Sequence, residues 1–172
     1  KKVGFSVGGF EDALLKSMLN FHGISLSDIE LINVNFALSP SLISGKVDAV
    51  IGAFRNFELN QMNIINIPGR AFYPEEHGVP AYDELILVTH KNALKDRRLR
   101  KFLDALESAT LFLINHPEKA WADFISYDKS LDDKLNRLAW RDTLPRFALR
   151  PSALDRNRYN RFSDFLKKQN LI

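Results

Sequence analysis

The chain has 172 residues, of which 45% are hydrophobic, 11% aromatic and 26% charged, and its formal net charge is +3. A chain of this length and composition can bury a sizeable core, which excludes collagen, a coiled coil and a disordered tail. It contains no cysteine, so disulfide bonds, thiolate metal sites and cysteine nucleophiles are excluded. The small positive charge does not predict a nucleic-acid partner.

Short apolar runs alternate with amphipathic stretches over the first 70 residues. Strands are predicted at 3–7, 30–35, 47–52 and 64–67, and helices at 10–21, 39–44 and 56–62. The first helix has apolar residues at three- and four-residue spacing, and Gly23 directly beyond it is typical of a helix C-terminus. Ser39 and Pro40 are predicted to cap and start the second helix. Strands joined by such short connections favour parallel βαβ units and an α/β fold.

The pattern changes near residue 80. A loop-like segment to residue 82 is followed by an apolar run that predicts a strand at 84–89, and from Asp96 onward the periodicity is almost wholly helical. We therefore expect residues 1–80 and residues 81–172 to form separate parts. The first residues have the pattern expected of a buried strand and not of a leader, and no apolar run is long enough to span a bilayer. Because chains rarely begin inside a core strand, we expect Lys1 to be a cut end.

Patterns typical of catalysis or metal binding are weak. The four histidines are scattered over different predicted elements, and none lies at ligand spacing from Asp, Glu or another His, so no metal site is predicted. Ser6 precedes a glycine pair but does not lie in the Gly-x-Ser-x-Gly pattern of serine hydrolases. The basic run at residues 95–101 falls on an amphipathic helix, where a solvated face is expected. These observations predict a protein that is not an enzyme and needs no cofactor.

The predicted strand ends carry better candidates for a ligand site. The glycine pair at 8–9 follows the first strand, where glycines let a ligand approach the N–H groups at a helix start. The segment at 52–58 follows a buried strand and places Arg55, Asn56 and Glu58 beside two phenylalanines. One interpretation is a helix start, with Asn56 as N-cap and Glu58 in the first turn. The other is a pocket in which the rings sandwich a planar ligand while Glu58 accepts hydrogen bonds from it.

Four stretches of the sequence resemble one family. They are KKVGFSVGGFEDALL, NVNFALSPSLISGKVDAVIGAFRNFELNQM, HGVPAYDELILVTHK and RYNRFSDFLKKQNLI, in order from residue 1 to residue 172. The family is that of the substrate-binding proteins of ABC importers for the pyrimidine precursor of thiamin, which is hydroxymethylpyrimidine or its formylamino relatives. GKVDAVIG is shared by many solute-binding proteins, whereas SVGGF together with GAFRNFE is more specific.

The resemblance implies a type II periplasmic-binding-protein-like fold, with two α/β lobes around a ligand cleft. Residues 1–80 would form the second lobe, with strand ends that face the ligand. Residues 81–172 would form the hinge strand and the helical C-terminal part of the first lobe, whose opening segment is absent. The strand at 84–89 would then have unpaired edges, which would permit a dimer. The ligand-binding residues carried over from the matching motifs are Ser6, Gly8, Gly9, Asn35, Arg55, Asn56, Glu58 and Tyr82. Glu58 is expected to recognise the aminopyrimidine edge of the ligand.

The implied function is capture of a thiamin pyrimidine precursor for an ABC permease in the membrane. The implied location is periplasmic, or extracellular with a membrane anchor. Two alternatives stay open. One is an enzyme of the same fold that makes the pyrimidine phosphate; that branch carries a cysteine-rich, iron-associated motif, so the absence of cysteine weighs against it. The other is a receptor for a different small molecule, such as a sulfonate.

Overall fold

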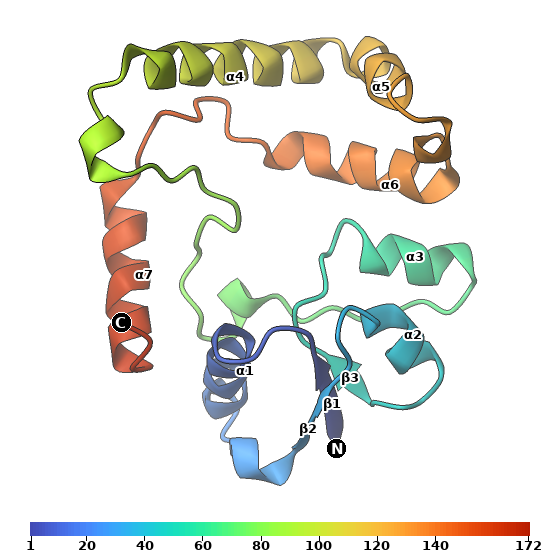
Figure 1. Ribbon diagram of the computed structural model, residues 1–172. Coiled ribbons are helices and arrows are strands. Elements are labelled where there is room, and N and C mark those ends of the chain that lie inside the picture. Colours follow the sequence, from blue (N-terminus) through green and yellow to red (C-terminus); the bar gives the residue numbers. More distant parts are fainter. The chain divides into compact units, whose positions relative to one another are not determined.

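The computed structural model describes residues 1–172, which form two compact units (Figure 1). Unit 1 comprises Lys1–Tyr82 and Asp155–Ile172, and unit 2 comprises Asp83–Leu154. The chain passes from unit 1 to unit 2 after Tyr82 and returns to unit 1 at Asp155. The assignment of residues 1–80 and 81–172 to parts of two lobes stays a prediction. None of the helices is both long and apolar enough to cross a membrane.

A three-stranded parallel sheet lies in unit 1, with the strand order β2-β1-β3 (Figure 1). The strands are β1 (Lys2–Phe5), β2 (Glu30–Asn33) and β3 (Ala49–Val50). In the register, Val3 of the central strand faces Leu31 on one side and Ala49 on the other. Gly4 is needed in this strand because a Cβ there would lie 3.2 Å from methyl groups of Val34 and Val50. The predicted α/β class is thus confirmed.

Three helices follow the strands of unit 1. They are α1 (Phe10–Phe21), α2 (Leu38–Ile43) and α3 (Glu58–Ile64). Helix α1 has its predicted bounds, and Gly23 beyond its end has φ +70°. Helix α2 begins two residues before Pro40, its predicted first residue, with Ala37 as N-cap, so Ser39 is buried inside the first turn and does not cap it. Apolar side chains join α2 to the sheet in a core of Val34, Leu38 and Val47.

The strand predicted at 64–67 is absent. Helix α3 continues to Ile64, and Asn66 then adopts a φ of +59°. The backbone N–H of Asn66 donates to the carbonyl of Asn63 at 3.1 Å, and that of Ile67 donates to the carbonyl of Met62 at 3.0 Å. These two bonds satisfy carbonyls at the end of α3, so the apolar run forms a helix C-terminus where the prediction has a strand.

The strand predicted at 84–89 is absent as well. An apolar run becomes a strand only where a neighbouring strand supplies hydrogen bonds, and no strand of the structure pairs with these residues. Leu85 and Val88 are 89% and 84% exposed, which is unusual for aliphatic side chains in one short run. The segment therefore presents an exposed apolar surface, which we call the aliphatic segment.

A second core of unit 1 joins α1 to the C-terminal helix α7 (Arg156–Lys168). Leu14 of α1, Val79 and Phe165 of α7 are buried together, with Phe10 and Tyr82 among the partly buried residues around them. Phe165 is the buried residue of α7, and its packing on Leu14 and Val79 is the physical reason why the end of the chain belongs to unit 1.

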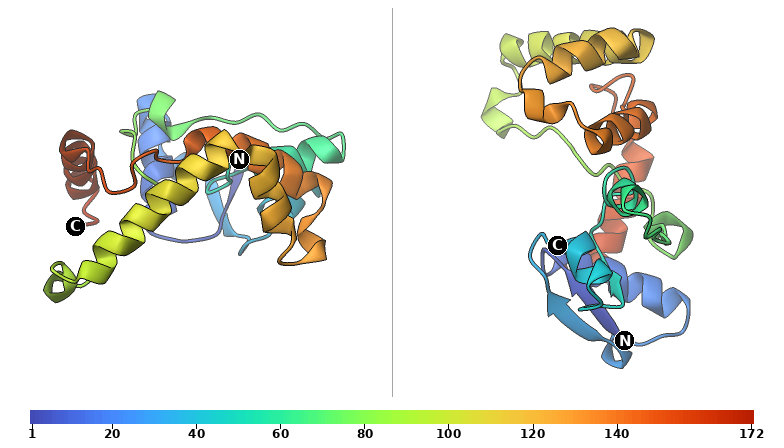
Figure 2. Two further views of the ribbon diagram at one scale, coloured as in Figure 1. Left: turned by 90° about the horizontal axis from the view of Figure 1, so that it is seen from above. Right: turned by 90° about the vertical axis from the view of Figure 1, so that its right-hand side faces the viewer.

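Unit 2 is helical. Its helices are α4 (Arg97–Asn115), α5 (Pro117–Ile125) and α6 (Lys134–Thr143), and Figure 2 shows α4 as one uninterrupted helix. Trp121 is buried, with its ring centroid 5.6 Å from that of Trp140. Arg137 lies 4.8 Å over the Trp121 ring and donates to Glu118 at 2.7 Å. Helical periodicity of apolar residues after Asp96 predicts that this part of the chain is helical.

Candidate ligand-binding site

The strand order β2-β1-β3 directs attention to the space beyond the ends of β1 and β3. In open α/β sheets, ligands bind beyond the carboxyl ends of the strands, at the point where the strand order reverses. For the order β2-β1-β3 that point lies between β1 and β3. The residues that follow β1 include the candidates Ser6, Gly8 and Gly9, and Gly52 lies two residues beyond the end of β3. The geometry therefore favours this edge of unit 1 as the ligand site.

Glu11 occupies this edge, and sequence reasoning missed it. Its Oε2 accepts hydrogen bonds from the backbone N–H of Ser6 at 2.9 Å and of Val7 at 3.2 Å. Gly52 has φ +89°, and a Cβ there would clash with the Glu11 carboxylate. The carboxylate therefore lies between the ends of the two strands. An acidic residue in the first turn after a glycine pair is the sequence signal that could have found it.

The glycine pair turns the chain from β1 into α1. Gly9 is the N-cap of α1 with φ +87°, and its N–H donates to Asp12 Oδ2 at 3.0 Å. The hydroxyl of Ser6 and the second oxygen of Asp12, Oδ1, are buried and have no hydrogen-bond partner in the protein. Buried polar atoms without partners are rare and mark a place where a ligand or a water is expected. Ser6, Gly8 and Gly9 are thus brought together at the candidate site.

Asn35 lies beyond the end of β2, the strand on the other side of β1. Its φ is +50°, in the left-handed region where Asn is tolerated, and its N–H donates to Asn33 Oδ1 at 2.8 Å. The residue is exposed, as is its neighbour Phe36, at 86%. The structure therefore places Asn35 at the carboxyl edge of the sheet, as predicted for a strand-end residue, while its role toward a ligand stays a prediction.

The segment after β3 has the local structure of a helix start. Glu58, the first residue of α3, accepts a hydrogen bond from the Phe54 N–H at 2.7 Å. The N-cap is Phe57, not Asn56. Both rings of the proposed sandwich are partly open to solvent, since Phe54 is 50% and Phe57 37% exposed. Of the two interpretations, the helix start describes the backbone, and the ring pocket stays a prediction.

Arg55 is engaged with residues outside the strand ends. Its guanidinium forms a two-pronged ion pair with Glu75, at 2.9 and 3.1 Å, and lies 4.0 Å over the Tyr73 ring. The hydrogen bond from Arg55 lowers the pKa of the Glu75 carboxyl, and the same bond raises the pKa of Arg55. This positive charge is therefore neutralised at Glu75.

Tyr82 packs beside the start of α1. Its ring stacks on Phe162 of α7, with centroids 4.5 Å apart, and meets Phe10 edge-on at 5.9 Å. Phe10 directly follows Gly9, so Tyr82 lies near the glycine pair within unit 1. The ring contributes to the core between α1 and α7, and its contact with a ligand stays a prediction.

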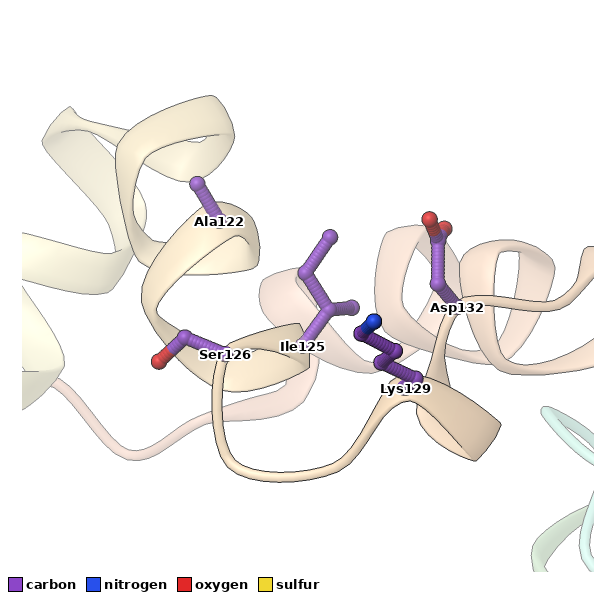
Figure 3. Close-up of a pocket in the computed structure, with 5 residues that line it drawn as sticks. All are labelled: Ala122, Ile125, Ser126, Lys129 and Asp132. Carbon is purple, nitrogen blue, oxygen red and sulfur yellow. The ribbon is translucent and has the colours of Figure 1, made fainter.

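Two hollows on the surface are lined by other residues. One, of about 530 Å³, is lined by Ala122, Ile125, Ser126, Lys129 and Asp132 at the end of α5 in unit 2 (Figure 3). The other, of about 500 Å³, lies in unit 1 against α7 and includes Ser17, Gly78 and Arg161. Neither is lined by a predicted ligand residue. The carboxyl edge of the sheet is therefore favoured by topology and chemistry and not by the size of a cavity.

Two of the histidines, which the sequence analysis treats as scattered, meet in the structure. His22 Nε2 and His77 Nδ1 are 3.0 Å apart, so one ring donates a hydrogen bond to the other. They join the end of α1 to the loop before Val79. No group of three or more His, Cys, Asp or Glu side chains is placed to hold a metal ion.

Comparison with known proteins adds a family to this geometry. Residues 1–120 match the family model described as NMT1/THI5 like. A Haemophilus influenzae protein named as a thiamine biosynthesis protein is 56% identical over the whole chain, which covers 55% of that protein. The formylaminopyrimidine-binding protein of Halalkalibacterium halodurans is 29% identical over 69% of the chain and 38% of its own length. A 4-amino-5-hydroxymethyl-2-methylpyrimidine phosphate synthase of Saccharomyces cerevisiae is 25% identical over 79% of the chain and 43% of its own length. The chain thus spans about half the length of these relatives.

Proposed function

Because the chain belongs to the NMT1/THI5-like family, we propose that it is the solute-binding component of an ABC transporter and captures a pyrimidine precursor of thiamin. The observation that carries the proposal is the meeting of the β1 and β3 ends at Glu11, beside the unpartnered Ser6 hydroxyl and Asp12 Oδ1. Carboxylates accept hydrogen bonds, and an aminopyrimidine offers N–H donors along one edge of a planar ring. The formylaminopyrimidine-binding relative supports the same ligand class.

In this proposal the chain binds and does not catalyse. The glycine pair lets the ring approach the backbone at the end of β1, and Asn35, Asn56 and Glu58 hold polar substituents from neighbouring strand ends. The overall architecture would be that of a type II periplasmic binding protein. A permease in the membrane would receive the ligand, and the protein would work in the periplasm or anchored outside the cell.

The aliphatic segment has a place in the same proposal. Its exposed Leu85 and Val88 would be covered when residues 84–89 pair as a strand, and a second copy of the chain is one source of that strand. A dimer would then be formed through backbone hydrogen bonds at this segment.

Isothermal titration calorimetry tests the ligand class directly. The purified protein is titrated with hydroxymethylpyrimidine, with its formylamino relative and with taurine as a sulfonate. Saturable heat from a pyrimidine and none from taurine would support the proposal. Saturable heat from taurine alone would overturn it in favour of a sulfonate receptor.

A second candidate function is synthesis of the pyrimidine phosphate, because synthases from yeasts match 79% of the chain. Binding alone does not separate the two candidates. Incubation of the protein with iron, oxygen and the synthase substrates, followed by mass spectrometry, does so. Formation of the pyrimidine phosphate would replace the receptor proposal by the enzyme.

A further inference from the structure

Three N–H groups of the turn that leads from β1 into α1 are bonded to carboxylates of the chain itself. The N–H groups of Ser6 and Val7 donate to Glu11, and that of Gly9 donates to Asp12. A glycine turn that leads from a strand into a helix ordinarily offers such groups to a phosphate, because they point outward and the helix dipole favours negative charge. Here two carboxylates from the first turn of the 12-residue helix α1 take that position.

The residues that follow β3 also border the position that Glu11 occupies. The absence of a side chain at Gly52 leaves room for the Glu11 carboxylate, which lies in contact distance of any Cβ built there. A phosphate group would have to displace this carboxylate from two hydrogen bonds and then remain next to it. The Glu11 carboxylate is thus held between the residues that follow β1 and Gly52.

Carboxylates follow both of the strand ends that meet at Glu11. Glu11 and Asp12 lie after β1 and Glu58 lies after β3, while Arg55 is paired with Glu75. A carboxylate and a phosphate group carry charge of the same sign, so a phosphate brought beside Glu11 would be repelled. In contrast, the unpartnered Asp12 Oδ1 is an acceptor that an N–H donor of a ligand would satisfy.

We propose that Glu11 and Asp12 make the site selective for a pyrimidine that carries no phosphate group. The proposal rests on the proposed function, because it concerns the ligand of the same site. In this proposal, the side chains of Glu11 and Asp12 discriminate between hydroxymethylpyrimidine, which is an alcohol, and its phosphate ester. Both ligands would meet the same fold. The preference for the alcohol comes from the negative charge of Glu11 and Asp12, which lie where a phosphate-binding glycine turn would present free N–H groups.

The test compares hydroxymethylpyrimidine with its phosphate ester by calorimetry. The variants are Glu11→Gln, Asp12→Asn and the double variant, because an amide oxygen keeps the acceptor and removes the charge. Glu30→Gln is the matched control, since Glu30 is exposed at the amino end of β2, the opposite edge of the sheet. We expect the wild type to bind the alcohol about 100-fold more tightly than the ester and the double variant to narrow this ratio at least about tenfold, with Glu30→Gln unchanged.

A second measurement does not depend on pyrimidine binding. Inorganic phosphate is titrated into each protein and followed by ³¹P NMR line broadening, with far-UV circular dichroism to show that each variant is folded. The double variant should bind phosphate at least about tenfold more tightly than the wild type and than Glu30→Gln. Equal phosphate binding by all three, or an ester bound as tightly as the alcohol by the wild type, would overturn the proposal. If no protein binds either pyrimidine while the phosphate result holds, the proposed function fails and the role of the two carboxylates stands.

Discussion

Replacing Gly52 by Ala should destabilise unit 1 through a clash with Glu11. Gly52 has a φ of +89°, which L-residues rarely adopt, and a Cβ at this position would meet the Glu11 carboxylate. Gly45 is the matched control, because its φ is +72° and nothing lies within 4 Å of a Cβ built there. Both substitutions therefore impose the same kind of backbone strain, and only Gly52→Ala also disturbs a side chain.

The expected losses follow from these two contributions. A non-glycine residue in the left-handed region costs about 1–2 kcal/mol, and this is the whole effect expected for Gly45→Ala. Displacing Glu11 breaks its hydrogen bonds with the N–H groups of Ser6 and Val7, which adds about 1–2 kcal/mol after water replaces part of the interaction. Gly52→Ala should therefore lower the free energy of unfolding by about 2–4 kcal/mol.

Urea unfolding followed by far-UV circular dichroism measures both losses. Tryptophan fluorescence would not report on the unfolding of unit 1, because Trp121 and Trp140 both lie in unit 2. The same substitutions are repeated in a Glu11→Ala background, where the clash is removed, and Gly52→Ala should then cost no more than Gly45→Ala. Equal losses for the two substitutions in the wild-type background, or a loss at Gly52 that is unchanged by Glu11→Ala, would refute the assignment of Glu11 to the space between β1 and β3.

Three further predictions concern other parts of the chain. The hydrogen bond from Arg55 lowers the pKa of the Glu75 carboxyl below its ordinary value of 4.5, so the unfolded state binds more protons than the folded state. The pair stabilises the protein by less than about 1 kcal/mol, because both groups are partly exposed. This stabilisation is full at neutral pH and is lost as the pH falls below 4.5. In urea unfolding, Glu75→Gln should therefore destabilise the protein more at about pH 7 than at about pH 3, and an equal loss at both would contradict this. Phe165→Ala should cost about 3–4 kcal/mol, because the ring is buried against α1, and a loss below about 1 kcal/mol would show that α7 is not part of this core. Leu85→Lys with Val88→Lys should change stability by less than about 0.5 kcal/mol and reduce self-association in sedimentation velocity, whereas a large destabilisation would show that the segment is buried.

Much of the fold is predictable from local patterns. Helices α1, α4 and α7 follow from apolar residues at helical spacing, and β1 follows from a buried run before a glycine turn. The run at 64–67 has the composition of a strand, but Asn66 in the left-handed region ends α3 there. The aliphatic segment has the composition of a strand too, and it lacks a strand to pair with. Pairing depends on residues distant in the sequence, which a local pattern does not contain.

The residues of the candidate site can likewise be divided into those that local patterns predict and those that they do not. The glycine pair and Asn35 are predictable as strand-end residues, because their position follows from the strands themselves. The position of Glu11 depends on the approach of Gly52 from a strand about 40 residues away, which only the tertiary structure shows. Glu75, the partner of Arg55, is likewise 20 residues distant in the sequence. The motif that contains Arg55 therefore does not predict that its side chain is engaged outside the strand ends.

The return of α7 to unit 1 has a consequence for the synthesis of the chain. Leu14 and Val79 are made early, but Phe165, which covers them, emerges from the ribosome only after the whole of unit 2. At ordinary rates of translation this delay is on the order of ten seconds, far longer than the folding time of a small domain. The nascent unit 1 therefore waits with an open apolar surface while unit 2, whose helices are continuous in sequence, folds beside the ribosome, and that interval is when a chaperone would bind.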